Sequence, residues 1–268
     1  MNIQYRWLLP IVFCLMPVFS PAAQPDLAEL SQSPAASSSP AAPPSAAVGF
    51  NALNSRVRDG DISREVARND LKRLLDELRR EYYQKGGADY GKDAWVFPLA
   101  GHGSRAMAGG RNRGYVASGY DYFSGNRHGG HPSFDIFITD RNRDSLDDRS
   151  GKPVKVQSLT GGIVVALERE WQPGSALRGG KYLWIYDPAN DLLVYYAHNS
   201  ELFVELGDVV KPGDQLAIVG RSGYNAMKRR SPSHLHLTVL HVRDGFPLPV
   251  NVHRELERAA AGGEPKKR

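Results

Sequence analysis

Cysteine is almost absent from this chain of 268 residues, since its single copy is Cys14, close to the N-terminus. One cysteine cannot form an intramolecular disulfide, so the fold must be stabilised by packing. The rest of the chain also lacks a thiolate that could act as a nucleophile or hold a metal. Any metal site must therefore use histidine and carboxylate side chains.

A hydrophobic run long enough to cross a membrane is also missing from the sequence. The apolar stretch at residues 7–19 is shorter than the about 20 residues that a membrane-spanning helix needs, and it contains prolines. It follows Arg6 and leads into small residues up to Ala23. This pattern predicts a signal peptide at residues 1–23 and a periplasmic or secreted protein, with a retained membrane anchor as the alternative.

Charge of neither sign is in large excess, because 34 lysine and arginine residues face 29 aspartate and glutamate residues, for a net charge of +5. A mild positive charge favours contact with an anionic cell envelope. Nucleic acid is not an expected partner, because no nucleic-acid-binding motif accompanies the charge.

Bulky apolar residues are scarce at residues 24–52, where serine, alanine and proline dominate and predict a flexible linker. A helical segment is expected at residues 53–94. Within it, Asp61–Gln84 has the period of an amphipathic helix that ends at Gly86 and Gly87. We interpret this helix as a support packed against the following domain, with an inhibitory pro-segment as the alternative. Its apolar stripe consists of Val66, Leu71, Leu74, Leu75, Leu78 and Tyr82.

Residues 95–253 contain short apolar segments separated by glycine, proline and aspartate turns, which predicts an all-β domain. This length is enough to enclose a hydrophobic core without disulfides. Residues 254–268 are expected to form a basic C-terminal tail that is disordered from Gly262 onward.

Three strand-like segments of this domain carry candidate metal-binding residues. His131 and Asp135 form an HxxxD pattern that runs into an apolar stretch. His198 closes a second apolar segment, and His234 and His236 form an HxH pattern that opens a third. Each short motif alone is weak evidence, but their occurrence together in one domain points to a common site.

The HxH pattern has a direct geometric meaning on a strand. Side chains two residues apart lie on the same side of a strand, so His234 and His236 point the same way. Leu235 and Leu237 then face an apolar layer behind the site. Two imidazoles on one face can share a metal, or one can bind it while the other acts beside it. Spacing alone leaves these two roles open.

Asp135 and His131 add a carboxylate oxygen and a nitrogen to this set. Two histidines and one carboxylate are a known ligand set for catalytic zinc, which keeps one position open for water. Zinc lowers the pKa of such a water to about 7, so a nucleophile is available at neutral pH. The pattern therefore predicts zinc-dependent hydrolysis.

The order and surroundings of these motifs resemble the lysostaphin-type (LytM-type) zinc metallopeptidases, which cut peptidoglycan cross-bridges. The resemblance extends from Trp95 to Pro249. It implies an antiparallel, barrel-like LytM-type β domain with features of biotinyl-like domains. The matching segments besides the histidine motifs are Phe97-Pro98, Thr160–Ala166, Tyr195–His198, Gly207–Ala217 and Val219–Gly223.

The resemblance also implies a role for each candidate residue. His131, Asp135 and His236 would bind zinc, and His234 would act as the general base. His198 would orient water or stabilise the oxyanion. A base must lie within hydrogen-bond reach of the attacking water, and a donor aimed at the developing oxyanion lowers the barrier.

The implied function is an exported zinc metalloendopeptidase that hydrolyses peptide bonds in peptidoglycan stem peptides or cross-links, with peptidoglycan as its partner. The first alternative is a non-catalytic regulator of another wall hydrolase, against which the intact site residues argue. The second is a secreted protease acting on protein substrates, and the third is a wall-binding module, for which no repeat is visible.

The chain departs from the family pattern in three places. Leu237 and Thr238 stand where Phe-Glu is more usual, the segment Tyr224–Ser233 is longer and more basic, and Asp140–Lys152 looks like an insertion. Oxygen-bearing residues alternate in Asp140–Asp148, which allows calcium binding, but a solvated loop is favoured because the usual glycine and glutamate are missing. Lys228–Arg230 is likewise interpreted as a solvated loop, with carboxylate binding as the alternative.

Aromatic residues and a further histidine precede the first motif. Tyr120, Tyr122 and Phe123 are expected mainly to pack, with a groove wall as the alternative. His128 is expected to be a loop residue, with substrate contact as the alternative.

Overall fold

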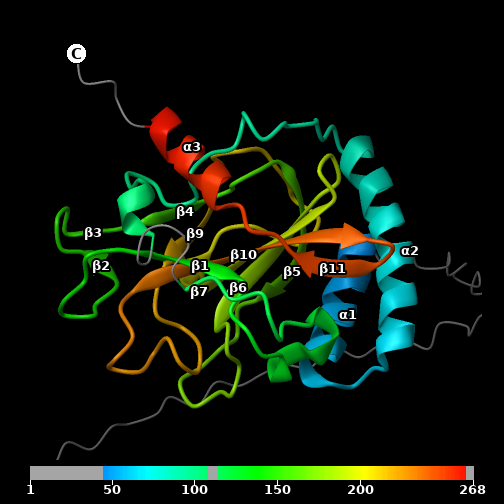
Figure 1. Cartoon of the computed structure of the whole chain (residues 1–268), viewed down its shortest axis with the longest axis horizontal. Helices are drawn as coiled ribbons and strands as arrows, with labels where there is room; N and C mark the ends of the chain where they lie inside the picture. The colour runs from blue at the N-terminus through cyan, green and yellow to red at the C-terminus, as the bar shows by residue number, and fades with distance from the viewer. Residues whose placement is uncertain (1–44, 108–113, 264–268) are drawn as a thin grey trace, which may run out of the picture. The chain divides into compact units, whose positions relative to one another are not determined.

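A computed structural model describes residues 45–107 and 114–263 of the chain (Figure 1). The predicted signal peptide at residues 1–23 and most of the predicted linker lie outside these residues. Within the described ranges, no helix combines the length and the apolar character that a membrane crossing requires.

Two helices precede the β domain. Helix α1 (Ala46–Asp59) begins after Ser45, whose hydroxyl accepts a hydrogen bond from the Val48 amide. It ends at Gly60, which has a left-handed backbone with φ of 84°. Helix α1 was not predicted from the sequence, and the linker prediction was wrong for residues 46–52. The reason is that α1 is held by few bulky side chains, with buried Phe50, Leu53 and Val57 at helical spacing inside a polar context.

Helix α2 (Arg64–Gln84) confirms the predicted helix from residue 64 onward, since Ser63 caps its first turn. Of the predicted apolar stripe, every member is buried except Val66, whose side chain is 49% exposed. Ala67 lies on the buried face instead. The stripe was therefore offset by one residue at its N-terminal end.

The β domain is built on an antiparallel sheet in which strand order β1-β10-β7-β6-β5-β8 differs from chain order. This confirms the predicted antiparallel β fold, to which the helices are added. The path strands are β1 (Ser133–Phe137), β5 (Gly162–Glu168), β6 (Lys181–Asp187), β7 (Leu192–Leu202), β8 (Val209–Val210) and β10 (His234–Arg243). Beside them lie β4 (Lys155–Gln157), β9 (Gln215–Val219), β11 (Phe246–Pro249), the separate pair β2 (Leu146–Asp147) and β3 (Lys152–Pro153), and the short 3-10 helices η1 (Ser104–Ala106) and η2 (Tyr122–Arg127).

The sheet buries a different cluster on each face. On one face Leu235 and Leu237 are fully buried with Ile136, as predicted for the apolar layer behind the HxH motif. On the other face α1 and α2 pack over aromatic residues such as Trp184 and Tyr186. The helices therefore cover part of the face of β10 that is opposite to Leu235 and Leu237, where Leu240 lies.

The C-terminal tail prediction was wrong for residues 254–263, which form most of helix α3 (His253–Gly263, red in Figure 1). Its residues Leu256 and Ala260 join the core behind the sheet, together with Val252. The two apolar residues are four apart, which is the spacing of one helix face. Such a short pattern among charged residues resembles a solvated tail in sequence.

Candidate metal centre

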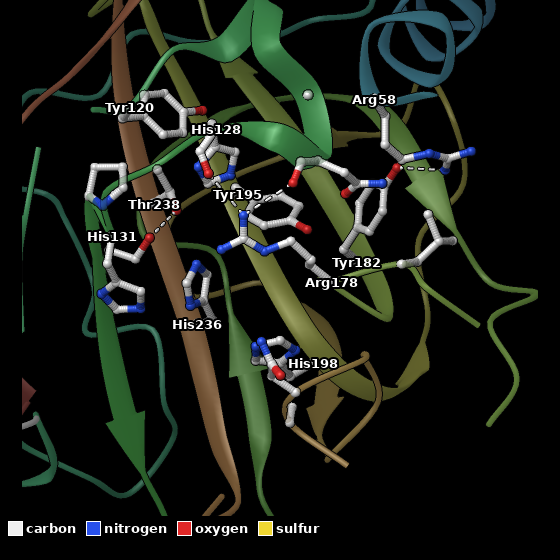
Figure 2. A pocket seen from close by; sticks show the side chains of 18 of the residues that line it. Arg58, Tyr120, His128, His131, Arg178, Tyr182, Tyr195, His198, His236 and Thr238 are labelled. Carbon is white, nitrogen blue, oxygen red and sulfur yellow. Dashed lines mark hydrogen bonds between the residues drawn. The ribbon is translucent and has the colours of Figure 1, made fainter. Parts of the chain in front are cut away.

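The five candidate residues, His131, Asp135, His198, His234 and His236, meet on one face of the sheet, and we call them the five site residues. Three adjacent strands bring them together, because β1 pairs with β10 and β10 pairs with β7. The register sets Asp135 directly opposite His236. His131 lies two residues before β1, where it forms an isolated bridge with Val116. Figure 2 shows His131, His236 and His198 side by side on these strands.

His198 reaches this face through an irregularity in β7. Ala197 lies opposite His236, so strict alternation would turn His198 to the other face. Its backbone instead has a positive φ of 67°, which is uncommon for a residue with a Cβ. As a result its ring lies 4.9 Å from that of His234 and 5.3 Å from that of His236, between ring centres.

The donor atoms form two overlapping groups. His131, Asp135 and His236 offer ligand atoms that all lie within 4.8 Å of one another, and so do His198, His234 and His236. The Asp135 carboxylate lies 3.0 Å from Nδ1 of His236, 3.5 Å from Nε2 of His131 and 3.6 Å from Nε2 of His234. His236 belongs to both groups, whereas His234 belongs to one of them.

Hydrogen bonds to backbone carbonyls fix the imidazole tautomers. Nδ1 of His131, His198 and His234 lies 2.8 Å from the carbonyl oxygens of Gly114, Ser222 and Pro232, respectively. A carbonyl oxygen only accepts, so each Nδ1 carries the hydrogen and, in the neutral ring, Nε2 keeps its lone pair. His236 differs, because its Nδ1 faces Asp135. Such supporting bonds are typical of histidines that bind or act beside a metal.

The environment also sets the charge of these groups. Burial would raise the pKa of Asp135, but hydrogen bonds from His131 and His236 outweigh it and lower that pKa well below its usual value. Burial lowers the pKa of His198 and of His236, with a further lowering by neighbouring histidines. The hydrogen bond with Asp135 raises the pKa of His131. An ionised carboxylate beside a neutral His236 is the state that metal binding requires.

The donor set fits zinc. Two imidazole nitrogens and one carboxylate oxygen converge, and His198 and His234 line an open pocket of about 300 Å³ beside them. Asp140–Asp148 shows no such convergence among the described residues. There the Asp140 carboxylate accepts from the Ser233 hydroxyl and from backbone amides of its own loop.

The pocket extends from the five site residues across the sheet to α1. Its floor contains Tyr195 and Trp184, whose rings stack with centres 4.5 Å apart. Its lining includes Tyr120, Tyr122 and His128, of which Tyr122 is 5% exposed and also packs in the helix-covered cluster. Phe123 is absent from the lining, and so are Lys228, Arg229 and Arg230.

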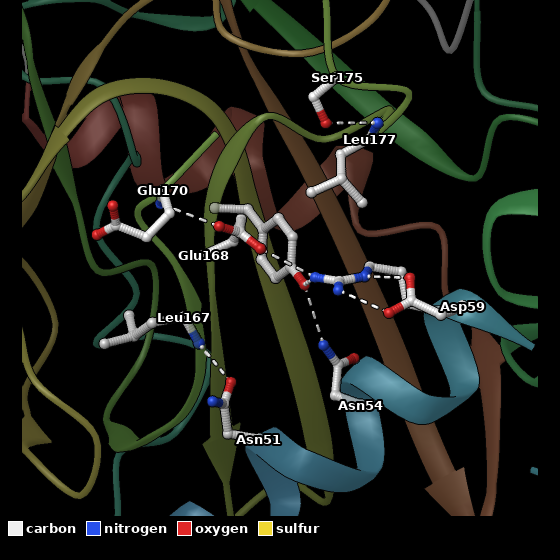
Figure 3. A network of polar contacts seen from close by, with 10 residues as sticks. Asn51, Asn54, Asp59, Leu167, Glu168, Glu170, Ser175 and Leu177 are labelled. Carbon is white, nitrogen blue, oxygen red and sulfur yellow. Dashed lines mark hydrogen bonds and ion pairs between the residues drawn. The ribbon is translucent and has the colours of Figure 1, made fainter. Parts of the chain in front are cut away.

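One end of the pocket is bounded by α1, through Asn54, Val57 and Arg58. Arg58 forms ion pairs with Asp59 at 2.8 Å and with Glu168 at 3.0 Å (Figure 3). The Tyr182 hydroxyl accepts hydrogen bonds from Arg58 and Asn54. These contacts agree with the interpretation of the helical segment as a packed support. Residues 46–84 supply no ligand atom to either donor group.

Several residues of the pocket lining were not predicted from the sequence, above all Arg178, Tyr195 and the residues of α1. Arg178 lies in the loop between β5 and β6, and no spacing or motif marked it. The two glycines that follow it, Gly179 and Gly180, indicate a tight loop but not a binding pocket. Its place in the pocket follows from the tertiary structure.

A family model for peptidase family M23 matches residues 144–247 of the chain, which confirms the predicted resemblance. The matched range contains His198, His234 and His236 and begins after His131 and Asp135. No curated protein gave a match.

Solved structures similar to the chain have low identity. A putative glycyl-glycine endopeptidase lytM from Ruminococcus gnavus has 23% identity and a TM-score of 0.42, with 80% of this chain and 82% of that chain covered. Lysostaphin from Staphylococcus simulans has 20% identity and a TM-score of 0.35, with 51% and 47% covered. A zinc-containing peptidase from Vibrio cholerae has 19% identity and a TM-score of 0.36, with 58% and 38% covered. The chain thus spans less than half the length of the last two.

Proposed function

We propose, from the premise that the chain is a peptidase of family M23, that it is an exported zinc metalloendopeptidase which hydrolyses peptide bonds of peptidoglycan. The observation that carries the proposal is the convergence of His131, Asp135 and His236 within 4.8 Å of one another beside an open pocket. Two histidines and a carboxylate are a ligand set of hydrolytic zinc sites.

The metal would be held by Nε2 of His131, a carboxylate oxygen of Asp135 and Nδ1 of His236. Zinc bound there would polarise the scissile carbonyl and lower the pKa of water to about 7. Asp135 supplies a negative charge that would attract a divalent cation. Asp135 and His236 lie directly opposite each other on the paired strands β1 and β10, so these two ligands would be held by rigid elements.

His234 is suited to act as the general base. Its side chain is buried, with 8% exposed, and its hydrogen on Nδ1 is held by the Pro232 carbonyl. The free lone pair of Nε2 therefore faces the Asp135 side of the pocket, where an attacking water would lie.

His198 carries its hydrogen on Nδ1, bound to the Ser222 carbonyl, so its neutral ring presents Nε2 as an acceptor. Burial and the nearby histidines keep the pKa of His198 low, which favours this neutral form. An acceptor orients water by taking one of its hydrogens, whereas oxyanion stabilisation requires a donor. Of the two roles implied by the resemblance, the tautomer favours orienting water.

The proposed substrate and compartment are supported by the match to peptidase family M23 and by the predicted signal peptide. A signal peptide would deliver the enzyme outside the cytoplasm, where peptidoglycan lies. The mild net charge of +5 favours contact with an anionic envelope.

The test is digestion of purified cell wall and of casein by the zinc-loaded chain, with mass spectrometry of released fragments. We expect peptide fragments from wall that are absent with His234→Ala, and the new termini identify the bond. Cleavage of casein without release from wall would favour a protease of protein substrates. A zinc-loaded chain that cleaves neither would favour the non-catalytic regulator.

A further inference from the structure

Arg178 is a cation in the pocket for which no acidic partner is found among the residues that the structure describes. One nitrogen of its guanidinium, Nη1, donates to the carbonyl oxygens of Asn126 and His128 at 3.3 and 3.1 Å. No carboxylate of the described chain lies within ion-pair distance of it. The other arginine of the lining, Arg58, is neutralised by Asp59 and Glu168. Arg178 therefore retains unused donors on a half-buried side chain.

The loop that carries Arg178 is held firmly beside the metal centre. The carbonyl of Gly179, the next residue, accepts a hydrogen bond from the amide of His198 at 2.9 Å. On the other side, the Leu177 carbonyl accepts from the Tyr224 amide at 2.9 Å. In Figure 2 the Arg178 side chain lies among His128, Tyr195 and His236, inside the pocket. Its guanidinium is thus presented from a rigid backbone.

Tyr195 adds a second unused donor at the same place. Its ring is stacked on Trp184, but its hydroxyl has no hydrogen-bond partner among the described residues. A tyrosine hydroxyl is protonated at neutral pH, because its ordinary pKa is about 10, so it can donate a hydrogen bond. A Cβ on Gly179 would lie 1.8 Å from this hydroxyl, so a glycine beside Arg178 leaves the hydroxyl its space.

We propose that Arg178 and Tyr195 form a carboxylate-binding subsite, and that the substrate is a peptide with a free carboxylate close to the scissile bond. This inference rests on the proposed function. Arginine binds carboxylates through two parallel hydrogen bonds, and a hydroxyl donor adds a third. Stem peptides of the wall carry free carboxylates, so the chemistry matches.

Helix α1 lines the same pocket as Arg178, through Asn54, Val57 and Arg58. The carboxylate bound by Arg178 is either the terminal one of the peptide or that of a side chain next to the cleaved bond. Both have the same chemistry, and substrates can distinguish them.

The experiment compares the zinc-loaded full chain with its Arg178→Gln variant on synthetic stem peptides. Each peptide is made with all carboxylates free, with the terminal carboxylate amidated, or with the side-chain carboxylate amidated. We expect the wild type to prefer one free carboxylate by about 10- to 100-fold in kcat/KM, as charge-assisted hydrogen bonds imply. The Arg178→Gln variant loses that preference. The amidated position at which wild type loses the rate advantage identifies which carboxylate, terminal or side-chain, binds Arg178.

Two further variants serve as comparisons. Arg229→Gln removes an equal charge from an exposed loop residue outside the pocket lining, and it retains the preference. Tyr195→Phe keeps the stacked ring and reduces the preference in part. If Arg178 only holds Asn126 and His128 in place, Arg178→Gln lowers kcat/KM equally on the free-acid and the amidated peptides, and that result overturns the proposal. A wild type that cleaves the free-acid and the amidated peptides equally well overturns it too.

Binding measurements separate the subsite from the proposed activity. The same peptides are titrated by calorimetry into zinc-loaded wild type and Arg178→Gln. Tighter binding of the free acid that depends on Arg178, with no peptide cleaved, sustains the subsite and contradicts the proposed hydrolysis. Cleavage of acid and amide at equal rates and with equal affinities sustains the hydrolysis and contradicts the subsite.

Discussion

At the scale of single residues, backbone geometry that few residue types tolerate holds the site in place. His198 has a positive φ of 67°, and Gly223, with φ of 112°, packs against its ring. Residues in such conformations persist only where their surroundings fix them, and they often lie at functional sites. Here the irregular segment brings a third histidine to the face that carries Asp135 and His236.

Gly223→Ala is expected to lower both stability and turnover. Its Cβ would lie 2.4 Å from the Arg178 carbonyl oxygen and 2.9 Å from Nδ1 of His198, so both residues must shift. The control is Gly174→Ala, which has a similar positive φ of 98° but no atom within 4 Å of the added Cβ. Gly174→Ala should cost about 1 kcal/mol of unfolding free energy and leave kcat unchanged. Equal effects of the two substitutions on kcat in peptide assays would contradict this account.

Asp140→Asn is expected to destabilise the protein in a pH-dependent way. Burial alone would raise the pKa of Asp140, but bonds from Ser233 and from backbone amides lower it below its usual value. A lowered folded-state pKa contributes stability above the unfolded-state pKa, and this stability is lost as pH falls through the folded-state pKa. The loss on substitution should be about 1–2 kcal/mol at pH 7 and should vanish in acid.

Urea unfolding at several pH values measures this difference between wild type and Asp140→Asn. Asp61→Asn, at an exposed position outside the regular elements, is the control and should match wild type throughout. A difference for Asp140→Asn that stays constant from neutral to acidic pH would argue against the ionised carboxylate as the stabilising group.

At the scale of elements, the helices α1 and α2 are integral to the fold. They share a buried cluster with Trp184, Tyr186 and Leu240 of the sheet. Leu78 is fully buried in this cluster, whereas Val66 on the same helix is 49% exposed.

Leu78→Ala should therefore lower the unfolding free energy by about 2–5 kcal/mol, because it removes buried methyl groups and leaves a cavity. Val66→Ala should change it by less than about 0.5 kcal/mol. Chemical denaturation of both variants provides the measurement. Comparable small effects would mean that α2 is loosely attached and that the N-terminal segment is not a packed support.

Helix α3 gives a matching prediction at the other end of the chain. Leu256 is fully buried, and Arg254 is exposed on the same helix. Leu256→Ala should cost about 2–5 kcal/mol, while Arg254→Ala should be nearly neutral. Should Leu256→Ala unfold at the same denaturant concentration as wild type, residues 254–263 would behave as the tail that the sequence suggested.

The elements that could be predicted from the sequence are those with a strong local period. Helix α2 has six buried apolar residues at helical spacing. In strand β10, Leu235, Leu237 and Val239 lie two residues apart and share the core behind the sheet, as the HxH pattern requires. Helices α1 and α3 were missed because small or charged residues surround their few buried side chains. Their stability comes from tertiary packing, which a local pattern does not contain.

For the site, the sequence indicated all five site residues, since metal chemistry demands particular residue types in short motifs. It did not indicate the rest of the pocket. Arg178 stands out because no acidic partner lies near it among the described residues. Only the three-dimensional structure shows this. Lys228–Arg230, the basic run that stood out in the sequence, lies outside the pocket lining.

At the scale of the whole domain, one sheet serves two purposes. One face buries the core with Leu235 and Leu237, and the other is shared between the helices and the five site residues. Helix α1 consequently bounds the pocket through Arg58 while it also packs on the sheet. Stability and access to the site are therefore linked, because a shift of α1 changes the end of the pocket.

The central claim is that His131, Asp135 and His236 hold a zinc ion while His234 acts beside it. The most direct test is the zinc content of purified wild type, His236→Ala and His234→Ala, measured together with peptide release from cell wall. The account predicts about one zinc per chain in wild type and in His234→Ala, none in His236→Ala, and release by wild type alone. Full zinc content in His236→Ala would contradict it.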